Sequence, residues 1–183
     1  MGRVFVHMSV SVDGYFEGLD GDISWHRMDA ELHQHVNDEL RSVANYLEGR
    51  RSYELMQSYW PTADLDPDAP AEVRDFAATW RSTPKVVASR TLNSVDPADT
   101  LVRDVDAGLV RSLAERGDVA VGGAELAGHV LALGLVDVLR IYVHPVVIGE
   151  GRPLFAPGAQ HDLRLDESRS FTNGVVLLRY AVL

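Results

Sequence analysis

Short β-type runs alternate with amphipathic helical patterns along most of this chain, and that alternation limits its possible folds more than any other feature. In residues 3–12, every second side chain is apolar, which predicts a strand. Residues 29–42 carry apolar side chains at helical spacing, so they predict a helix with Asp29 as its N-cap. Strands that alternate with helices pack as a mostly parallel sheet with helices on both faces.

The same two patterns continue to the end of the chain. Three prolines in residues 60–70 predict a loop, and Asn173-Gly174 between two β-type runs, 163–171 and 175–183, predicts a hairpin. The other expected strands are 43–47, 85–89, 101–103, the run before the glycines at 122 and 123, and 138–148; the other expected helices are 51–59, 71–81, 106–115 and one that ends at Gly134. We therefore expect one α/β domain over residues 1–183, in three layers, with an antiparallel edge on its sheet.

Composition narrows the possible partners. The formal net charge is −10 and the longest basic run is Arg50-Arg51, so we expect a small-molecule partner and no nucleic acid. The chain has no cysteine, which excludes disulfides, thiolate zinc sites and cysteine nucleophiles. No apolar run is long enough to span a bilayer, and the first residues do not read as a signal peptide. A cytoplasmic protein is therefore expected.

The first candidate site follows the β-type run that ends near residue 47. Gly49, Arg50, Arg51 and Ser52 stand where a helical pattern begins. Two guanidinium groups, a hydroxyl and free backbone N–H groups at a helix start suit a pyrophosphate or a ribose 2′-phosphate. A plain loop with solvated arginines is an equally good interpretation.

Two further turns at strand ends have the same character. Ser89, Arg90 and Thr91 suit a phosphomonoester, because ligands of open α/β sheets gather at the carboxyl ends of strands; a surface turn is the alternative. Gly122 and Gly123 either relieve crowding in a tight turn or let a flat ligand lie against the backbone, with its phosphates at the helix start. Three such turns together indicate one extended ligand with several phosphates, such as a dinucleotide.

Other polar residues give weaker signals. Asp13 follows the first strand and precedes a glycine-bearing loop, so it either faces a substrate or belongs to an Asp-Gly turn. His33 and His35 are two residues apart and point to different faces of a helix, while His26 and His33 have no evident third ligand. We therefore expect solvated helix histidines and no metal site. The chain has no G-x-S-x-G motif, so nothing supports a serine hydrolase.

Five segments, in the order SVDG, GRRSYE, ASRTL, VGG and VHPVVIGEGRPLF, resemble the dihydrofolate-reductase-like superfamily. The likeness covers nearly the whole chain. It is greatest to the branch that contains the reductase domain of the bifunctional riboflavin-biosynthesis deaminase-reductase and small stand-alone bacterial proteins. The resemblance implies a three-layer αβα sandwich on a mixed sheet that ends in an antiparallel hairpin, in agreement with the periodicity.

The resemblance also implies NADPH bound in an extended pose. Its implied contacts are Gly49, Arg50, Arg51 and Ser52 with the pyrophosphate and adenosine phosphates, Ser89, Arg90 and Thr91 with the 2′-phosphate and adenine, and Gly122, Gly123, Ala124, Glu125 and Leu126 beside the nicotinamide and pyrophosphate. The resemblance further implies a homodimer, and the apolar run 138–148 is expected in its interface.

The implied activity is hydride transfer to a small heterocycle that is pterin-like or ribosylaminopyrimidine-like. Asp13 and Asp29 are the candidate catalytic residues, for proton handling or substrate anchoring. Trp25, Gly149 and Gly151 are the candidates on the substrate side. Ser24 stands before Trp25 where dihydrofolate reductases carry proline, and the Asp-Asp-Pro segment of the riboflavin enzyme is absent, so the substrate stays open.

Two rival functions follow from the same residues. A non-catalytic NADPH-binding or sensor protein would keep the cofactor groove without turnover. A phosphate-transfer enzyme would need a phosphate-binding loop and metal-binding carboxylates, and the sequence shows neither.

Overall fold

β-branched and other apolar side chains fill the central strands on both faces, as parallel strands between two helical layers require. The computed structural model, which describes residues 1–183, has one eight-stranded mixed sheet in the order β5-β4-β3-β6-β1-β7-β10-β9. Its strands are β1 (Val4–Ser11), β3 (Asn45–Gly49), β4 (Lys85–Ala88), β5 (Thr100–Val102), β6 (Val119–Gly122), β7 (Val138–His144), β9 (Leu163–Ser170) and β10 (Val176–Val182). The first six of these in the chain are parallel to one another, while β10 runs antiparallel to β7 and β9.

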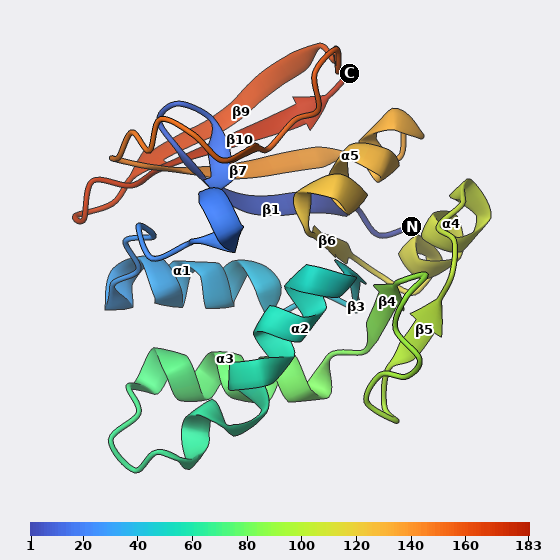
Figure 1. Ribbon diagram of the computed structural model, residues 1–183, viewed down its shortest axis with the longest axis horizontal. Helices are drawn as coiled ribbons and strands as arrows, with labels where there is room; N and C mark the ends of the chain where they lie inside the picture. The colour runs from blue at the N-terminus through green and yellow to red at the C-terminus, as the bar shows by residue number, and fades with distance from the viewer.

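Helices cover both faces of this sheet (Figure 1). The helices are α1 (Ala30–Leu40), α2 (Arg50–Tyr59), α3 (Ala71–Ser82), α4 (Ala107–Glu115) and α5 (Ala124–Ala132), with short 3₁₀ helices η1 (Leu19–Gly21) and η2 (Trp60–Leu65). Buried side chains of α1, α2 and α3 share one core with one face of the sheet, and those of α4 and α5 share a second core with the other face. The predicted three-layer αβα sandwich with a terminal antiparallel hairpin is therefore confirmed.

Several predicted boundaries were wrong. The strand expected at 43–47 is β3, two residues later, and β7 ends at His144 instead of Ile148, because Pro145 has no N–H for the ladder. The first half of the loop expected at 60–70 is the 3₁₀ helix η2. The pattern also gave no sign of the small second sheet, in which β2 (Tyr15–Glu17) pairs with β8 (Arg152–Pro153).

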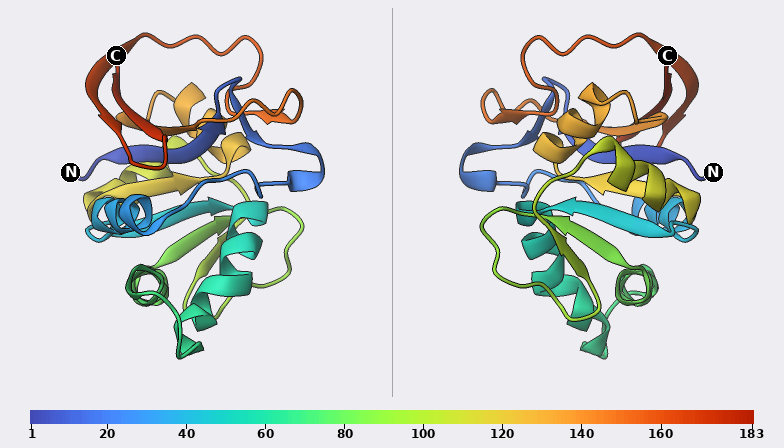
Figure 2. Two further views of the ribbon diagram at one scale, coloured as in Figure 1. Left: turned by 90° about the vertical axis from the view of Figure 1, so that its left-hand side faces the viewer. Right: turned by 90° about the vertical axis from the view of Figure 1, so that its right-hand side faces the viewer.

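The strand order brings four carboxyl ends together at one edge of the sheet. In the order β4-β3-β6-β1, each of these parallel strands ends beside its neighbour, and a turn to a helix or loop follows each one (Figure 2). The three turns predicted to bind phosphate therefore lie along one edge, because parallel strands end on the same side of a sheet.

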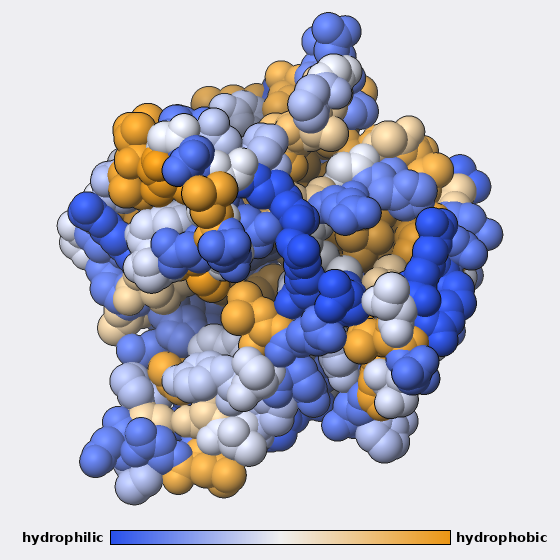
Figure 3. Space-filling model, in the orientation of Figure 1, coloured by the Kyte–Doolittle hydropathy of each residue, from blue (hydrophilic) through white to orange (hydrophobic).

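The surface is mixed in character. In the view of Figure 3, hydrophilic residues cover most of the face, and apolar residues appear only in small separate patches. No helix combines the length and the apolar character needed to cross a membrane.

Candidate functional site

The turns after β3 and β6 touch each other. Gly123 has φ +91°, a left-handed conformation that favours glycine. A Cβ at Gly123 would lie 3.6 Å from the Cβ of Ser52 and 3.9 Å from the Cα of Gly49. The first turns of α2 and α5 therefore start side by side at the carboxyl edge.

Both helices start without a side-chain cap. Gly49 is the N-cap of α2 and Gly123 is the N-cap of α5, and neither helix receives a side-chain hydrogen bond there. By contrast, Asp29 caps α1 and Asp106 caps α4 with their carboxylates. Uncapped N–H groups and the positive ends of two helix dipoles make this edge suited to an anion.

A buried carboxyl group lies directly behind the two turns. Glu48 is 5% exposed, and a Cβ on Gly122 would overlap its carboxylate. Ser52 donates a hydrogen bond to Glu48 Oε2. Burial raises the pKa of Glu48 to about 7, while the Ser52 hydrogen bond and the Lys85 charge act to lower it. Gly122 is thus required by Glu48, an explanation that the sequence did not reveal.

The two arginines of α2 are already paired with carboxylates. Arg50 lies 2.9 Å from Glu54, one helical turn away. Arg51 lies 3.8 Å from Glu17 of β2, and its side chain is 65% exposed. Glu17 also contacts Arg152 of β8 at 3.1 Å, so it links α2 to the small second sheet. Both α2 arginines lie at the solvent-exposed rim, where an anionic ligand can compete for them.

The turn after β4 is closed by its own serine. Ser89 is buried, and its Oγ accepts hydrogen bonds from the N–H groups of Thr91 and Leu92 at 3.2 and 3.0 Å. Arg90 projects from this turn with 83% of its side chain exposed, 2.8 Å from Asp104. Ser89 therefore shapes the turn, and Arg90 is exposed where an anionic ligand can compete with Asp104 for its guanidinium.

The residues after the glycine pair divide between core and surface. Ala124 and Leu126 are buried in the core beneath α5, so only their backbone atoms can meet a ligand. Glu125 is exposed in the first turn.

The two candidate catalytic carboxylates both have structural partners. Asp13 accepts hydrogen bonds from the N–H groups of Gly149 at 2.8 Å and Ile148 at 3.3 Å. Its pKa lies below the ordinary value, first because of a hydrogen bond with the Ser11 side chain. Asp29 caps α1 by accepting from the Leu32 N–H at 2.9 Å. These contacts favour structural roles for both and give no support to proton donation by Asp13.

One candidate substrate residue, Trp25, lies in a groove of about 360 Å³ between the segments that follow β2 and β7. Trp25 lines it with Gly18, Leu19, Asp22, Ile148 and Glu150. Gly149 lies next to this groove with φ +79°, and a Cβ on Gly151 would overlap the carbonyl of Glu17. Gly151 is thus needed for the contact between β2 and β8, while Trp25 offers the flat apolar wall.

The prediction of solvated helix histidines was wrong for His33. His33 is buried instead of solvated and packs against Trp60 and Phe76. His26 and the fully buried His144 stack at 5.0 Å beside Trp25, and their Nε2 atoms have no partner. The only sequence signal for His144 was its place at the end of an apolar β-type run. No three His, Asp or Glu side chains come together as a metal site.

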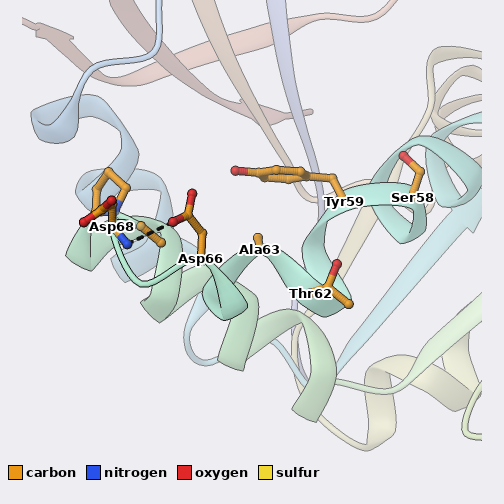
Figure 4. Close-up of a pocket in the computed structure, with 8 residues that line it drawn as sticks. Ser58, Tyr59, Thr62, Ala63, Asp66 and Asp68 are labelled. Carbon is orange, nitrogen blue, oxygen red and sulfur yellow. Dashed lines mark hydrogen bonds between the residues drawn. The ribbon is translucent and has the colours of Figure 1, made fainter.

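A second hollow, of about 230 Å³, lies between the end of α2, η2 and the segment that leads into α3 (Figure 4). Tyr59 extends toward Asp66 and Asp68 there, and the Asp68 N–H donates to Asp66 Oδ1 at 2.9 Å. The lining contains none of the predicted site residues and no cation. The carboxyl edge of the sheet is therefore the better candidate site.

Comparison with known proteins identifies relatives of the whole chain. Residues 3–177 match the family described as the RibD C-terminal domain. The chain is 34% identical over 182 residues to the uncharacterized protein YyaP of Bacillus subtilis (strain 168), a match that covers 97% of this chain and 94% of that protein. These matches confirm the resemblance inferred from the five segments.

Solved structures share the fold at low sequence identity. A protein from Shewanella sp. PV-4, described as belonging to riboflavin biosynthesis, has a TM-score of 0.73 at 19% identity, with 99% of each chain covered. The diaminohydroxyphosphoribosylaminopyrimidine deaminase/5-amino-6-(5-phosphoribosylamino)uracil reductase of Thermotoga maritima has a TM-score of 0.70 at 14% identity. That match covers 100% of this chain and 57% of the Thermotoga chain.

Proposed function

The chain belongs to the RibD C-terminal domain family, and from this membership we propose that it is an NADPH-dependent reductase of the riboflavin-pathway type. Its substrate would be a small pterin-like or ribosylaminopyrimidine-like heterocycle. The observation that carries the proposal is the pair of uncapped helix starts, α2 and α5, in contact at the carboxyl edge.

Along this edge, successive groups of residues fit successive parts of a dinucleotide. Backbone N–H groups after Gly49 and Gly123 would bind the pyrophosphate. Arg90, beyond the end of β4, would pair with the 2′-phosphate, because a guanidinium and a phosphate form charge-assisted hydrogen bonds. The groove lined by Trp25 would hold the substrate ring.

Bound NADPH would supply the hydride. The chain's own share is to hold and orient two flat rings. Asp13, through its hydrogen bonds to the segment around Gly149, would fix one wall of the substrate groove. We assign Asp13 this positioning role because its carboxylate is occupied by backbone N–H groups.

Titration of the purified protein with NADPH and NADH, followed by quenching of tryptophan fluorescence, tests the proposal. We expect saturable NADPH binding with clear preference over NADH, because only NADPH carries the 2′-phosphate. For the Arg90→Ala variant, Arg111→Ala on the exposed face of α4 is the control for the loss of one surface charge. Absence of binding to either nucleotide would remove the reductase proposal and leave the fold intact.

A non-catalytic nucleotide-binding protein is the second candidate. One observation favours it: the two carboxylates predicted to handle protons, Asp13 and Asp29, both hold backbone N–H groups. Tight NADPH binding without oxidation in the presence of pterin and ribosylaminopyrimidine substrates would support this alternative.

We also propose a homodimer in the cytoplasm. The predicted interface at 138–148 finds little support, because β7 lies between β1 and β10 and most of its side chains are buried. The edge strand β9 is a better candidate, since it is exposed along almost its whole length and one edge is unpaired.

A further inference from the structure

Glu48 is a buried carboxyl group at a place that the proposed function reserves for phosphates. It is the residue immediately before the α2 turn, its neighbour across the sheet is Gly122 of the α5 turn, and Ser52 in the first turn of α2 donates to it. The same side chain therefore contacts both turns. Nothing in hydride transfer or phosphate binding requires a carboxyl group there.

We propose that Glu48 is a positioning residue whose protonated form holds the α2 and α5 turns in a state that accepts an anionic ligand, and whose ionised form opposes that ligand. The inference rests on the proposed dinucleotide site. It goes beyond that site by adding proton-coupled control of affinity.

The physical reason is the short distance between the buried Glu48 carboxyl group and the helix starts where a phosphate would bind. A phosphate at the two helix starts and an ionised Glu48 would repel each other across a single layer of backbone, where the effective dielectric constant is low. Protonation removes that repulsion. By linkage, a bound anion raises the pKa of Glu48, and ligand binding takes up a proton wherever the free site is ionised.

The charged groups around Glu48 help to set the pH range in which its carboxyl group ionises. Lys85 on β4 lowers the pKa of Glu48, and Lys85 is itself paired with Asp99 at 3.8 Å, with Asp96 adding to the field around it. Tyr46, on the same strand, has a pKa raised chiefly by burial and remains neutral. The arginines of α2 contact Glu54 and Glu17 instead of Glu48. Burial outweighs these contacts, so the pKa of Glu48 is raised to about 7.

The first experiment needs no nucleotide. The free energy of unfolding by urea is measured from pH 4.5 to 8.5 in the wild type, in Glu48→Gln and in the control Glu115→Gln, which removes an exposed carboxylate on α4. Because the folded-state pKa lies above the unfolded one, the unfolded state binds fewer protons between these values and the stability from Glu48 is lost as pH rises toward 7. Measured as the difference from the wild type, the stability of Glu48→Gln should rise with pH across this range, and that of Glu115→Gln should stay flat.

Ser52→Ala provides a second test that does not depend on how well Glu48→Gln folds. Loss of the Ser52 hydrogen bond removes an interaction that lowers the pKa of Glu48. In Ser52→Ala, the stability that protonated Glu48 contributes should therefore be lost at a higher pH than in the wild type. An unchanged profile in both variants would overturn the claim that Glu48 titrates in this range.

The second experiment measures the Kd of NADP⁺, a probe that survives mild acid, between pH 5.5 and 8.5. As pH rises across this range, we expect NADP⁺ binding to weaken about tenfold more in the wild type than in Glu48→Gln. The 2′-phosphate of NADP⁺ titrates in both measurements, so its effect cancels in the comparison. Equal pH dependence in the two proteins would overturn the coupling while the dinucleotide site stands. No binding at any pH, with the stability difference present, would overturn the dinucleotide site and the coupling that rests on it.

Discussion

At the scale of single residues, the glycine pair of the β6 turn has two separate physical causes. Gly123 needs a left-handed φ, and Gly122 needs room for the Glu48 carboxylate. Only the second cause depends on another residue. This difference predicts that a substitution of Gly122 can be compensated elsewhere and that one of Gly123 cannot.

Gly122→Ala is expected to lower the free energy of unfolding by about 2–4 kcal/mol, because the new methyl group overlaps a buried carboxylate. Adding Glu48→Ala should recover part of that loss, since it clears the same space. Urea unfolding of both single variants and the double variant measures this interaction. Gly128→Ala on α5 is the control, because a Cβ there meets no other atom within 4 Å. Additive effects of the two changes would contradict the steric explanation.

Arg90→Ala is expected to weaken NADPH binding roughly tenfold to a hundredfold and to leave NADH binding nearly unchanged. The reason is that the exposed guanidinium would meet only the 2′-phosphate, and a hydrogen bond to a charged group contributes about 1.5–3 kcal/mol. Fluorescence titration with both nucleotides measures the two losses, with Arg111→Ala as the control. Equal weakening of NADPH and NADH would contradict this role for Arg90.

At the scale of elements, the helix starts differ in whether a carboxylate caps their N–H groups. Asp29 and Asp106 cap α1 and α4, whereas α2 and α5 start at glycines with no side-chain cap. A capping carboxylate occupies the N–H groups that an anion would otherwise bind. α3 also starts without a side-chain cap, at Pro70, so the pair suited to ligand binding is set apart by the contact between the α2 and α5 turns.

Asp29→Ala is expected to cost about 1 kcal/mol of folding stability, the usual value of a lost N-cap, and Asp29→Ser should restore most of it because serine also caps. Thermal unfolding of the three proteins measures this. If Asp29 handles protons, Asp29→Ser would be stable yet fail to oxidise NADPH with substrate. If Asp29 only caps, Asp29→Ser would recover both properties.

At the scale of the whole molecule, two desolvated histidines lower the stability of the fold in acid. Burial lowers the pKa of His7 to about 3 and that of His144 to about 4. His144 accepts a hydrogen bond at Nδ1 from the Arg27 N–H, so its neutral ring carries the proton at Nε2. Both folded-state pKa values lie below 6.5, so the unfolded state binds more protons in acid and stability falls as pH falls.

His7→Phe should reduce the loss of stability between pH 7 and pH 4 by about 3 kcal/mol relative to the wild type. Phenylalanine keeps an aromatic ring against Tyr142 and has no group to protonate. Urea unfolding at several pH values measures the two slopes. His161→Phe, at an exposed position, is the control. Parallel slopes for wild type and His7→Phe would contradict a desolvated, neutral His7.

The homodimer is tested by light scattering at micromolar concentration, where we expect twice the 20.2 kDa mass of the chain. Leu165→Lys on the edge strand β9, where the leucine is 52% exposed, should shift the protein toward monomer. A monomeric wild type would contradict the dimer, and a dimeric Leu165→Lys would move its interface away from β9.

The sequence by itself determined the type of nearly every element and the chemistry of its turns. Periodicity predicted the strand at 3–12 and the helix after Asp29, and Asn173-Gly174 predicted the terminal hairpin, all of which the structure contains. The physical reason is that these signals are local. Side-chain period, caps and turn glycines act on backbone within a few residues.

Only the tertiary structure decided which of these local features meet. It placed the Glu48 carboxyl group over Gly122, gave Asp13 the N–H of Gly149 as partner, and buried His33 and His144. Each depends on contact between segments far apart in the chain or on the depth of a side chain in the core. Desolvation and long-range charges then set the pKa of Glu48, and no local pattern encodes either one.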